Sequence, residues 1–224
     1  NVGAYRRTTS EFATDATLIA NPNNPSQDIL GNSVRLREHS FNLDGTGYAE
    51  VADDSSLDFG TGDFSLECWV KYDFLNQGSS FNVILSNGNI SSSGGSGFSL
   101  ASRSSDFAVR LNAGSAQTVY FGSGLTQGQW YHIVFTRSGT TFKAYLDKSL
   151  TTATKALVDV DTSLPVRIGR DTTTARYYIN LIDDVRLYNK ALSAEEVERN
   201  YNSGIDAHIV GSSFSDDFSS DYGN

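Results

Sequence analysis

The chain has 224 residues, a formal net charge of −9 and a single cysteine, Cys68. The negative charge makes nucleic acid an unfavourable partner, because phosphate binding depends on clustered Lys and Arg. One cysteine cannot form a disulfide within the chain, and no run of about 18 apolar residues indicates a membrane-spanning helix. The abundance of Gly, Ser, Thr, Phe and Tyr is typical of short strands joined by tight turns, so we expect an all-β protein without membrane insertion.

Residues 1–37 have weak hydrophobic periodicity, and Pro22 and Pro25 prevent regular structure around them. We expect an extended N-terminal arm that faces a partner, with a flexible linker as the alternative. The sequence begins at Asn1 without Met or a signal-peptide pattern, so we expect a processed product or a piece of a longer chain.

Strand-like runs separated by turn residues follow between residues 38 and 188. They occupy residues 41–51 (two strands around a Gly turn), 64–72, 81–85, 98–101, 107–111, 119–121, 162–169 and 177–188. Pro165 cannot donate a ladder hydrogen bond, so residues 162–169 are predicted to form an edge strand. In residues 177–188, Asp183 interrupts an otherwise apolar face.

Residues 129–150 form the most regular pattern of the chain, a hairpin that turns at Ser138–Gly139. The first strand of this hairpin is apolar on both faces. Trp130 and Val134 share one face, and Ile133 and Phe135 share the other. A strand of this kind is normally covered on both sides, so we place the hairpin at the centre of a two-sheet sandwich.

One helix is predicted after the last strand. Ser193 is a favourable N-cap, and Glu196 three residues later completes a capping box. The helix is expected to run to about Tyr201 and to end before Gly204. Residues 205–224 form an acidic C-terminal tail.

Five motifs occur in a characteristic order. They are Phe41-x-x-Asp44-Gly45-x-x-Tyr48, Phe64-Ser65-Leu66-Glu67-x-Trp69-Val70, Trp130-Tyr131-His132-Ile133-Val134, Ala144-Tyr145-Leu146-Asp147 and Ile182-Asp183-Asp184-Val185-Arg186-Leu187-Tyr188. The series resembles the laminin-G-like domains of the concanavalin A-like lectin and glucanase superfamily, over about residues 41–202. The resemblance implies an antiparallel two-sheet jelly roll with one short C-terminal helix, which we bound at residues 38–204. Lys148 and Leu181 stand where the family commonly has Gly.

The carboxylates do not form a recognisable catalytic pattern. Glycoside hydrolysis normally needs two carboxylates that face each other across a cleft. Hydrolases of this superfamily often have Glu-x-Asp-x-x-Glu on one strand, whereas Glu67 has no carboxylate two or four residues later. His132 is interpreted as a structural histidine. We therefore predict no catalytic residues and no enzyme activity.

A structural calcium ion is expected from the resemblance, because members of the superfamily often carry one between an early segment and the last strand. The family pattern makes Asp183 a ligand and the turn at Asp44 a contributor. A carboxylate on an apolar strand face also has to be paired or metal-bound. The alternative is that Asp183 accepts hydrogen bonds from backbone donors or pairs with an arginine.

Sugar recognition needs exposed aromatic rings beside planar polar groups. The best local set comprises Arg170, Asp171, Arg176, Tyr177 and Tyr178. The alternative is that the two tyrosines fill the sheet.

These observations predict a non-catalytic recognition or adhesion module that binds an extracellular ligand, a glycan or glycoprotein, within a larger surface assembly. The first alternative is a structural component of a virion or surface layer whose terminal arms bind neighbouring subunits, and the second is a glycoside hydrolase. The expected location is extracellular, on a cell surface or on a virion surface.

Overall fold

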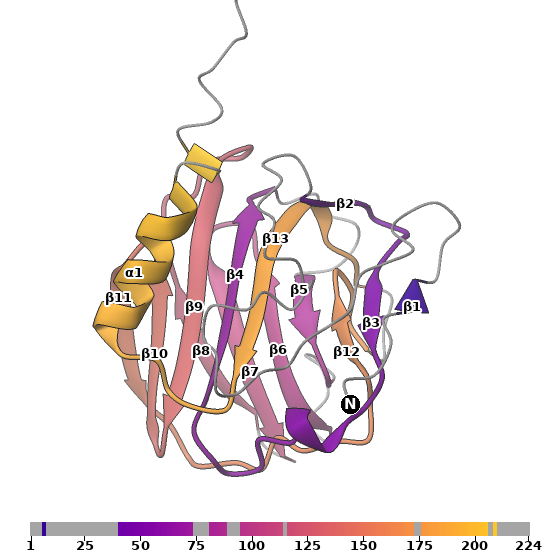
Figure 1. Ribbon diagram of the computed structural model, residues 1–224, viewed down its shortest axis with the longest axis vertical. Coiled ribbons are helices and arrows are strands. Elements are labelled where there is room, and N and C mark those ends of the chain that lie inside the picture. Colours follow the sequence, from indigo (N-terminus) through magenta and orange to yellow (C-terminus); the bar gives the residue numbers. More distant parts are fainter. Residues whose placement is uncertain are drawn as a thin grey trace, which may run out of the picture.

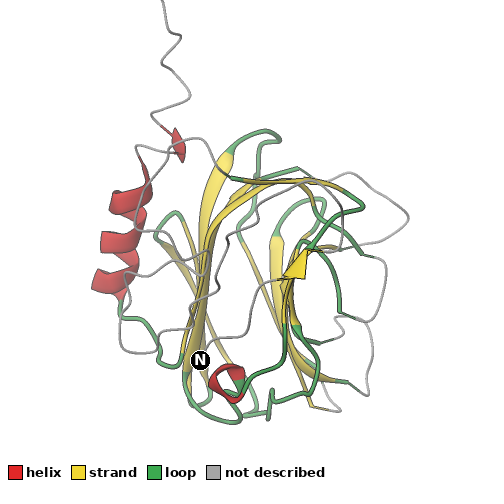
Figure 2. Cartoon of the chain, turned by 45° about the vertical axis from the view of Figure 1, so that its right-hand side comes forward, coloured by secondary structure: helices red, strands yellow, loops and turns green. Residues whose placement is uncertain are grey.

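The computed structural model describes residues 6–7, 40–73, 81–88, 95–113, 116–172, 176–205 and 208–209. The described strands form two layers that face each other, with one helix on the outside of one layer (Figures 1 and 2). The predicted antiparallel two-sheet sandwich with a C-terminal helix is thus confirmed. Within the described part of the chain, no helix is long and apolar enough to cross a membrane.

The six-stranded sheet has the order β11-β10-β9-β4-β13-β2. Its strands are β2 (Phe41–Asp44), β4 (Phe64–Lys71), β9 (Trp130–Ser138), β10 (Thr141–Leu146), β11 (Ser149–Thr154) and β13 (Ile179–Tyr188). The predicted hairpin is β9–β10, and Gly139 in its turn has a φ of 55°. β9 lies inside the sheet between β10 and β4, as its apolar faces indicated.

The seven-stranded sheet has the order β1-β3-β12-β5-β6-β7-β8. Its strands are β1 (Arg6–Arg7), β3 (Ala49–Val51), β5 (Asn82–Ser86), β6 (Ser96–Ser102), β7 (Phe107–Ala113), β8 (Gln117–Phe121) and β12 (Val166–Ile168), and a short 3-10 turn, η1 (Ser55–Leu57), follows β3. Two residues of the predicted N-terminal arm therefore form β1, which pairs with β3. The rest of the arm and residues 210–224 of the predicted tail lie outside the described residues.

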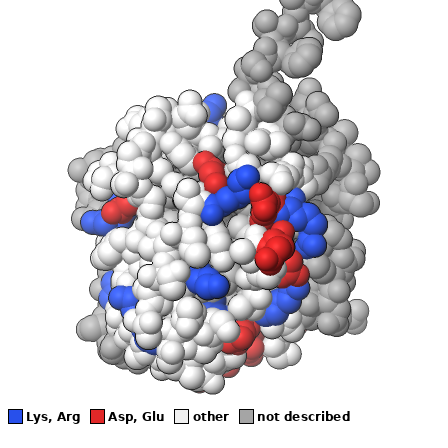
Figure 3. All heavy atoms as spheres, turned by 90° about the vertical axis from the view of Figure 1, so that its left-hand side faces the viewer, with Lys and Arg blue, Asp and Glu red and all other residues white. Residues whose placement is uncertain are grey.

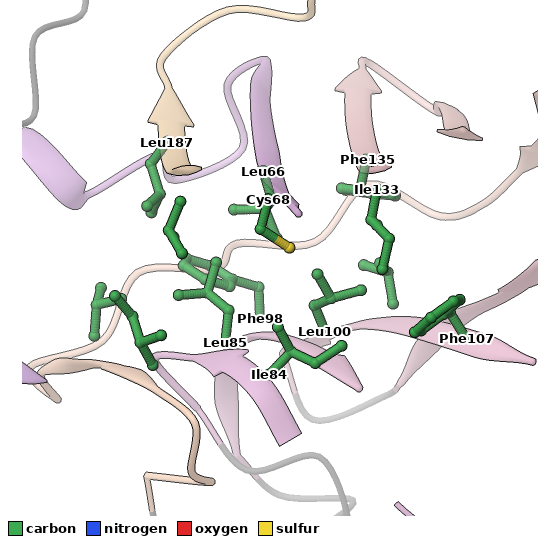
Figure 4. Packing of buried hydrophobic residues seen from close by; sticks show 14 of the residues in the cluster. Leu66, Cys68, Ile84, Leu85, Phe98, Leu100, Phe107, Ile133, Phe135 and Leu187 are labelled. Atoms are coloured by element: carbon green, nitrogen blue, oxygen red, sulfur yellow. The ribbon is translucent and has the colours of Figure 1, made fainter. Parts of the chain in front are cut away.

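The main core lies between the two sheets. Figure 4 shows Leu66, Cys68 and Leu187 of the six-stranded sheet pointing toward Leu85 and Phe98 of the seven-stranded sheet. Cys68 is fully buried, and burial raises the pKa of its thiol above the usual range. The alternation of apolar residues along the strands thus accounts for the sandwich.

β12 is not the edge strand that Pro165 predicted. It pairs with β3 on one side and with β5 on the other. The prediction was wrong because Pro165 lies one residue before the strand begins, where no ladder donor is required.

The register of β13 changes in its middle. Tyr178 and Ile182 face the core before this point, and Val185 and Leu187 face it afterwards. A β-bulge between Asp183 and Arg186, with a φ of 50° at Asp184, moves the apolar face from even to odd positions. The sequence suggested that Asp183 interrupts one continuous apolar face. That interpretation was wrong, because the apolar face changes sides at the bulge.

Helix α1 (Ala194–Ile205) covers the outer face of the six-stranded sheet. The predicted capping box is present: the Glu196 N–H donates to Ser193 Oγ at 3.2 Å, and the Ser193 N–H donates to Glu196 Oε2 at 2.9 Å. A second apolar cluster lies beneath the helix. It consists of Val134, Tyr145, Tyr188, Leu192 and Val197.

The helix continues through Gly204, where it was predicted to stop. A Cβ atom at this position would lie 2.5 Å from Nε1 of Trp69. Gly204 is thus placed for close packing of the helix against the indole of Trp69, and it does not terminate the helix.

A buried carboxylate joins the helix to the sheet. Glu67 of β4 is fully buried, and its Oε1 lies 2.8 Å from Nε2 of His132 on β9. Its Oε2 accepts hydrogen bonds from the hydroxyl of Tyr188 and, at 3.0 Å, from Nδ2 of Asn200 on α1. Arg186 lies 3.4 Å from Oε1.

Burial alone would raise the pKa of the Glu67 carboxyl. The hydrogen bond from His132 and the charge of Arg186, with the hydrogen bond from Tyr188, outweigh burial and lower the pKa to about 2. The carboxylate therefore stays ionised inside the protein and holds β4, β9, β13 and α1 together.

We predict that Glu67→Gln destabilises the protein by about 3 kcal/mol near neutral pH, because Arg186 and His132 lose the buried charge that they face. The pKa of Glu67 falls from 4.5 to about 2 on folding. This contribution is therefore complete above about pH 5 and is lost as the pH falls toward 2. Urea unfolding across this range should show the free energies of unfolding of wild type and variant converging in acid.

The control is Glu198→Gln, because Glu198 is an exposed partner of Lys148. This variant should change stability by less than about 1 kcal/mol. A pH-independent difference for Glu67→Gln would contradict the assignment.

We also predict that Gly204→Ala lowers the free energy of unfolding by about 1–2 kcal/mol, although alanine normally stabilises a helix by about 1 kcal/mol relative to glycine. The added methyl group would collide with Trp69 and push the helix away from the sheet. Chemical denaturation of Gly204→Ala beside Asn202→Ala, an exposed position on the same helix, tests this. A stabilised Gly204→Ala variant would show that the helix does not pack as described.

Candidate functional site

The candidate site is built around Arg170, which lies between two tyrosine rings. Its guanidinium carbon lies 4.9 Å from the ring centre of Tyr48 and 5.0 Å from that of Tyr177. An antiparallel bridge pairs Arg170 with Tyr177, and Tyr48 directly precedes β3. Such contacts are favourable because the ring face is electronegative.

Arg167 extends this arrangement from the outer face of β12, because its neighbours Val166 and Ile168 face the core. Its guanidinium lies 4.9 Å from the ring centre of Tyr48. Its Nε donates to Glu50 Oε2 at 2.8 Å, and a terminal nitrogen donates to the carbonyl of Thr172 at 2.6 Å. Tyr48 therefore contacts two guanidinium groups, and hydrogen bonds hold that of Arg167 in place.

Arg176 and Asp171 adjoin the stack as a pair. The backbone N–H of Asp171 donates to the carbonyl of Arg176 at 3.0 Å, and Arg176 lies 3.4 Å from Asp171 Oδ2. Asp171 is fully buried, whereas Arg176 is partly exposed. Asp171 therefore orients Arg176 and does not itself face a ligand, so its predicted role in ligand contact is corrected.

Tyr178, which was predicted as a ligand-binding residue, does not lie on the surface. It is fully buried in the main core, and its hydroxyl donates to the carbonyl of Lys71 at 2.7 Å. Burial raises the pKa of this phenol well above its usual range. Adjacent residues of a strand point to opposite sides, so Tyr177 and Tyr178 cannot form a common platform.

The resulting surface, which we call the Arg–Tyr surface, comprises Tyr48, Glu50, Arg167, Arg170, Arg176 and Tyr177. All six residues are partly exposed. Aromatic rings and planar guanidinium groups are fixed side by side, with more positive than negative charge. This arrangement suits ligands that combine apolar C–H faces with hydroxyl or anionic groups.

Comparison with protein families gives a match over residues 43–198 to the concanavalin A-like lectin/glucanases superfamily, through its Laminin_G_3 domain. The chain belongs to this superfamily. The match confirms the resemblance that the five sequence motifs indicated. No curated protein matches the chain.

Among solved structures, this concanavalin A-like domain is similar to receptor-binding domains of toxins. The binding domain of Paraclostridial Mosquitocidal Protein 1 has a TM-score of 0.55 and 18% identity, over 70% of this chain and 41% of that chain. For botulinum neurotoxin type C, whose cell entry depends upon interaction with two ganglioside molecules, the TM-score is 0.55 and the identity 19%, over 70% and 40%. The botulinum neurotoxin serotype G binding domain has a TM-score of 0.51 and 16% identity, over 74% of this chain and 45% of that chain. The chain thus spans less than half of these structures, and the likeness concerns the fold.

The two predicted calcium ligands of the concanavalin A-like domain lie apart. Asp44 pairs with Ile179, whereas Asp183 is four residues further along β13. Oδ1 of Asp44 accepts hydrogen bonds from the hydroxyl and N–H of Thr46 and from the N–H of Gly47, which lower the pKa of Asp44 to about 2.

Asp183 has partners of its own. It accepts a hydrogen bond from the N–H of Asp184 at 2.8 Å, and its Oδ2 lies 3.1 Å from Nε2 of His208. Across the described ranges, no group of three or more His, Cys, Asp or Glu side chains is arranged to hold a metal. The described side chains therefore do not supply a calcium cage, and calcium binding stays a prediction on which nothing below depends.

Sequence analysis missed Tyr48, Glu50 and Arg167. The position of Arg167 between two core residues was a usable signal for an outward side chain. Its proximity to Tyr48 and Glu50 was not visible, because it results from the pairing of β12 with β3 across more than a hundred residues.

Proposed function

We propose that the chain is a non-catalytic glycan-recognition module that acts outside the cell and that the Arg–Tyr surface contacts the sugar. The observation that carries the proposal is the stack of Arg170 between Tyr48 and Tyr177, with Arg167 on Tyr48. Aromatic rings can pack against the C–H face of a sugar while neighbouring guanidinium groups donate to its oxygens.

The fold and its relatives support the same function. The solved structures that the chain resembles include the binding domain of a mosquitocidal protein and a structure of botulinum neurotoxin type C, whose cell entry depends upon interaction with two ganglioside molecules. This likeness is restricted to the fold, so the placement of the site depends on the described residues alone.

A hydrolase is the less favoured function. Glu67 lies on β4, an inner strand of the six-stranded sheet, and would be the candidate catalytic carboxylate. It is fully buried, however, and hydrogen-bonded to His132, Tyr188 and Asn200. A carboxylate in this setting has no access to a substrate and serves to hold α1 on the sheet.

We predict that Tyr177→Ala and Arg170→Ala each reduce glycan binding about tenfold or more, because each removes one member of the stack. The full chain and its variants would be screened on a glycan array, and the affinity for any ligand found would be measured by calorimetry with calcium or with a chelator.

The matched control is Tyr120→Ala. Tyr120 on β8 is 51% exposed and lies 4.5 Å from the guanidinium of Arg103, so it reproduces the Arg–Tyr contact at the opposite end of the same sheet. This variant should bind as the wild type does. Loss of binding in Tyr120→Ala but not in Tyr177→Ala would move the site to β8, and absence of binding by the wild type would refute glycan recognition.

A further inference from the structure

β11 is an edge strand of the six-stranded sheet. Among the described strands it pairs with β10 alone. Its sequence is Ser-Leu-Thr-Thr-Ala-Thr, without a charged residue or a proline, and its register with β10 is regular throughout. Natural edge strands normally carry a charged residue, a proline or a bulge, because an open edge offers its backbone groups to another chain.

The geometry of the β10–β11 hairpin determines which backbone groups of β11 point away from the sheet. Asp147 and Lys148 form a two-residue turn with φ values of 45° and 72°, and Leu146 pairs with Ser149. The N–H of Lys155 donates to the carbonyl of Thr140 at 2.9 Å, so the odd-numbered residues bond inward. The backbone groups of Leu150, Thr152 and Thr154 therefore point away from the sheet.

These three residues are exposed, and Leu150 has half of its surface accessible. Figure 3 shows this side of the molecule, where charges of both signs gather in one part and a broad area carries neither. Lysines stand at both ends of the strand, at positions 148 and 155, and Lys143 lies opposite Thr152 on β10. The edge itself thus carries no charge; Lys155 stands at one end, and at the other end Lys148 is paired with Glu198.

The C-terminal segment of the chain has the complementary pattern. Residues 212–222 read Ser-Ser-Phe-Ser-Asp-Asp-Phe-Ser-Ser-Asp-Tyr. Phe214, Phe218 and Tyr222 all fall at even positions, while every odd position from 213 to 221 is Ser or Asp. Side chains alternate along a strand, so an extended form of this segment would have its three aromatic residues on one face, which also carries Asp216, and only Ser and Asp on the other.

We propose that the edge of β11 is a docking site for residues 212–222 of a second copy of this chain, which add to the six-stranded sheet as a strand. Main-chain hydrogen bonds to Leu150, Thr152 and Thr154 supply the affinity, and Lys155 offers a positive charge at the end of the edge to the acidic segment. The occupant is a second copy because the chain's own C-terminal end lies away from this edge: after α1, the ring of His208 stacks on Trp69 of β4 at 4.4 Å, and its Nε2 lies 3.1 Å from Oδ2 of Asp183 on β13. β9 and β10 separate β4 from β11, whereas a neighbour's tail is free to reach the edge and pair antiparallel with it.

Such a contact is head-to-tail, since each copy offers one tail and one edge. Two copies can exchange tails as a closed pair, or the contact can continue from copy to copy as a larger ring or an open filament. The Arg–Tyr surface belongs to the other sheet, so assembly leaves it accessible.

The test measures self-association of the full chain by sedimentation velocity over a range of concentrations. Thr152→Pro removes the central outward N–H, which has no partner on β10, and should weaken association at least about tenfold. Thr152→Val keeps the N–H and changes the same side chain, so it should associate as the wild type does. Thermal unfolding of both variants establishes that the monomer remains folded.

A charge exchange tests the tail independently. Lys155→Glu, and separately Asp216→Lys with Asp217→Lys, should each weaken association about two- to fivefold, and combining them should restore it. A chain that stays monomeric at every concentration would overturn the proposal, as would association indifferent to both Thr152→Pro and the charge changes. Protection of β11 amides that depends on the tail in a monomer would overturn it in favour of docking within one chain.

Discussion

Burial of the Glu67 carboxylate requires partners, and these partners join β4, β9 and β13 of the six-stranded sheet to helix α1. His132 comes from β9, Arg186 and Tyr188 from β13, and Asn200 from α1. An ionised group without these partners would cost several kcal/mol inside the protein. The network therefore specifies where the helix lies, and Gly204 allows the helix to approach the indole of Trp69 closely enough to complete it.

The β-bulge in β13 makes this network compatible with a continuous core. Before the bulge, even-numbered residues such as Ile182 face the core, and after it odd-numbered residues such as Val185 do. One extra residue in the strand thus keeps apolar side chains inside on both halves and turns Arg186 and Tyr188 toward Glu67. A strictly alternating strand would have directed either Val185 or Ile182 away from the core.

The two surfaces that we propose for partners lie on different parts of the sandwich. The Arg–Tyr surface is formed where β3 and β12 meet in the seven-stranded sheet, and the open edge is β11 of the six-stranded sheet. Each uses a different physical basis: stacked rings and cations in one case, and in the other backbone groups that have no partner among the described strands. Because they do not share residues, ligand recognition and assembly can occur on the same molecule.

The sequence by itself determined the sandwich, its central hairpin and the capped helix, because alternation, turn glycines and capping residues act over a few neighbouring positions. It also placed Arg170, Arg176 and Tyr177 on one segment. Only the tertiary structure decided that Tyr178 is core, that Asp171 is buried, that β12 is internal and that Tyr48 and Arg167 join the site. Those outcomes depend on which strands pair and in which register, and such contacts are made between residues far apart in the chain. Local sequence patterns do not contain these contacts. The bulge in β13 and the proline just before β12 therefore led to wrong predictions for these two strands.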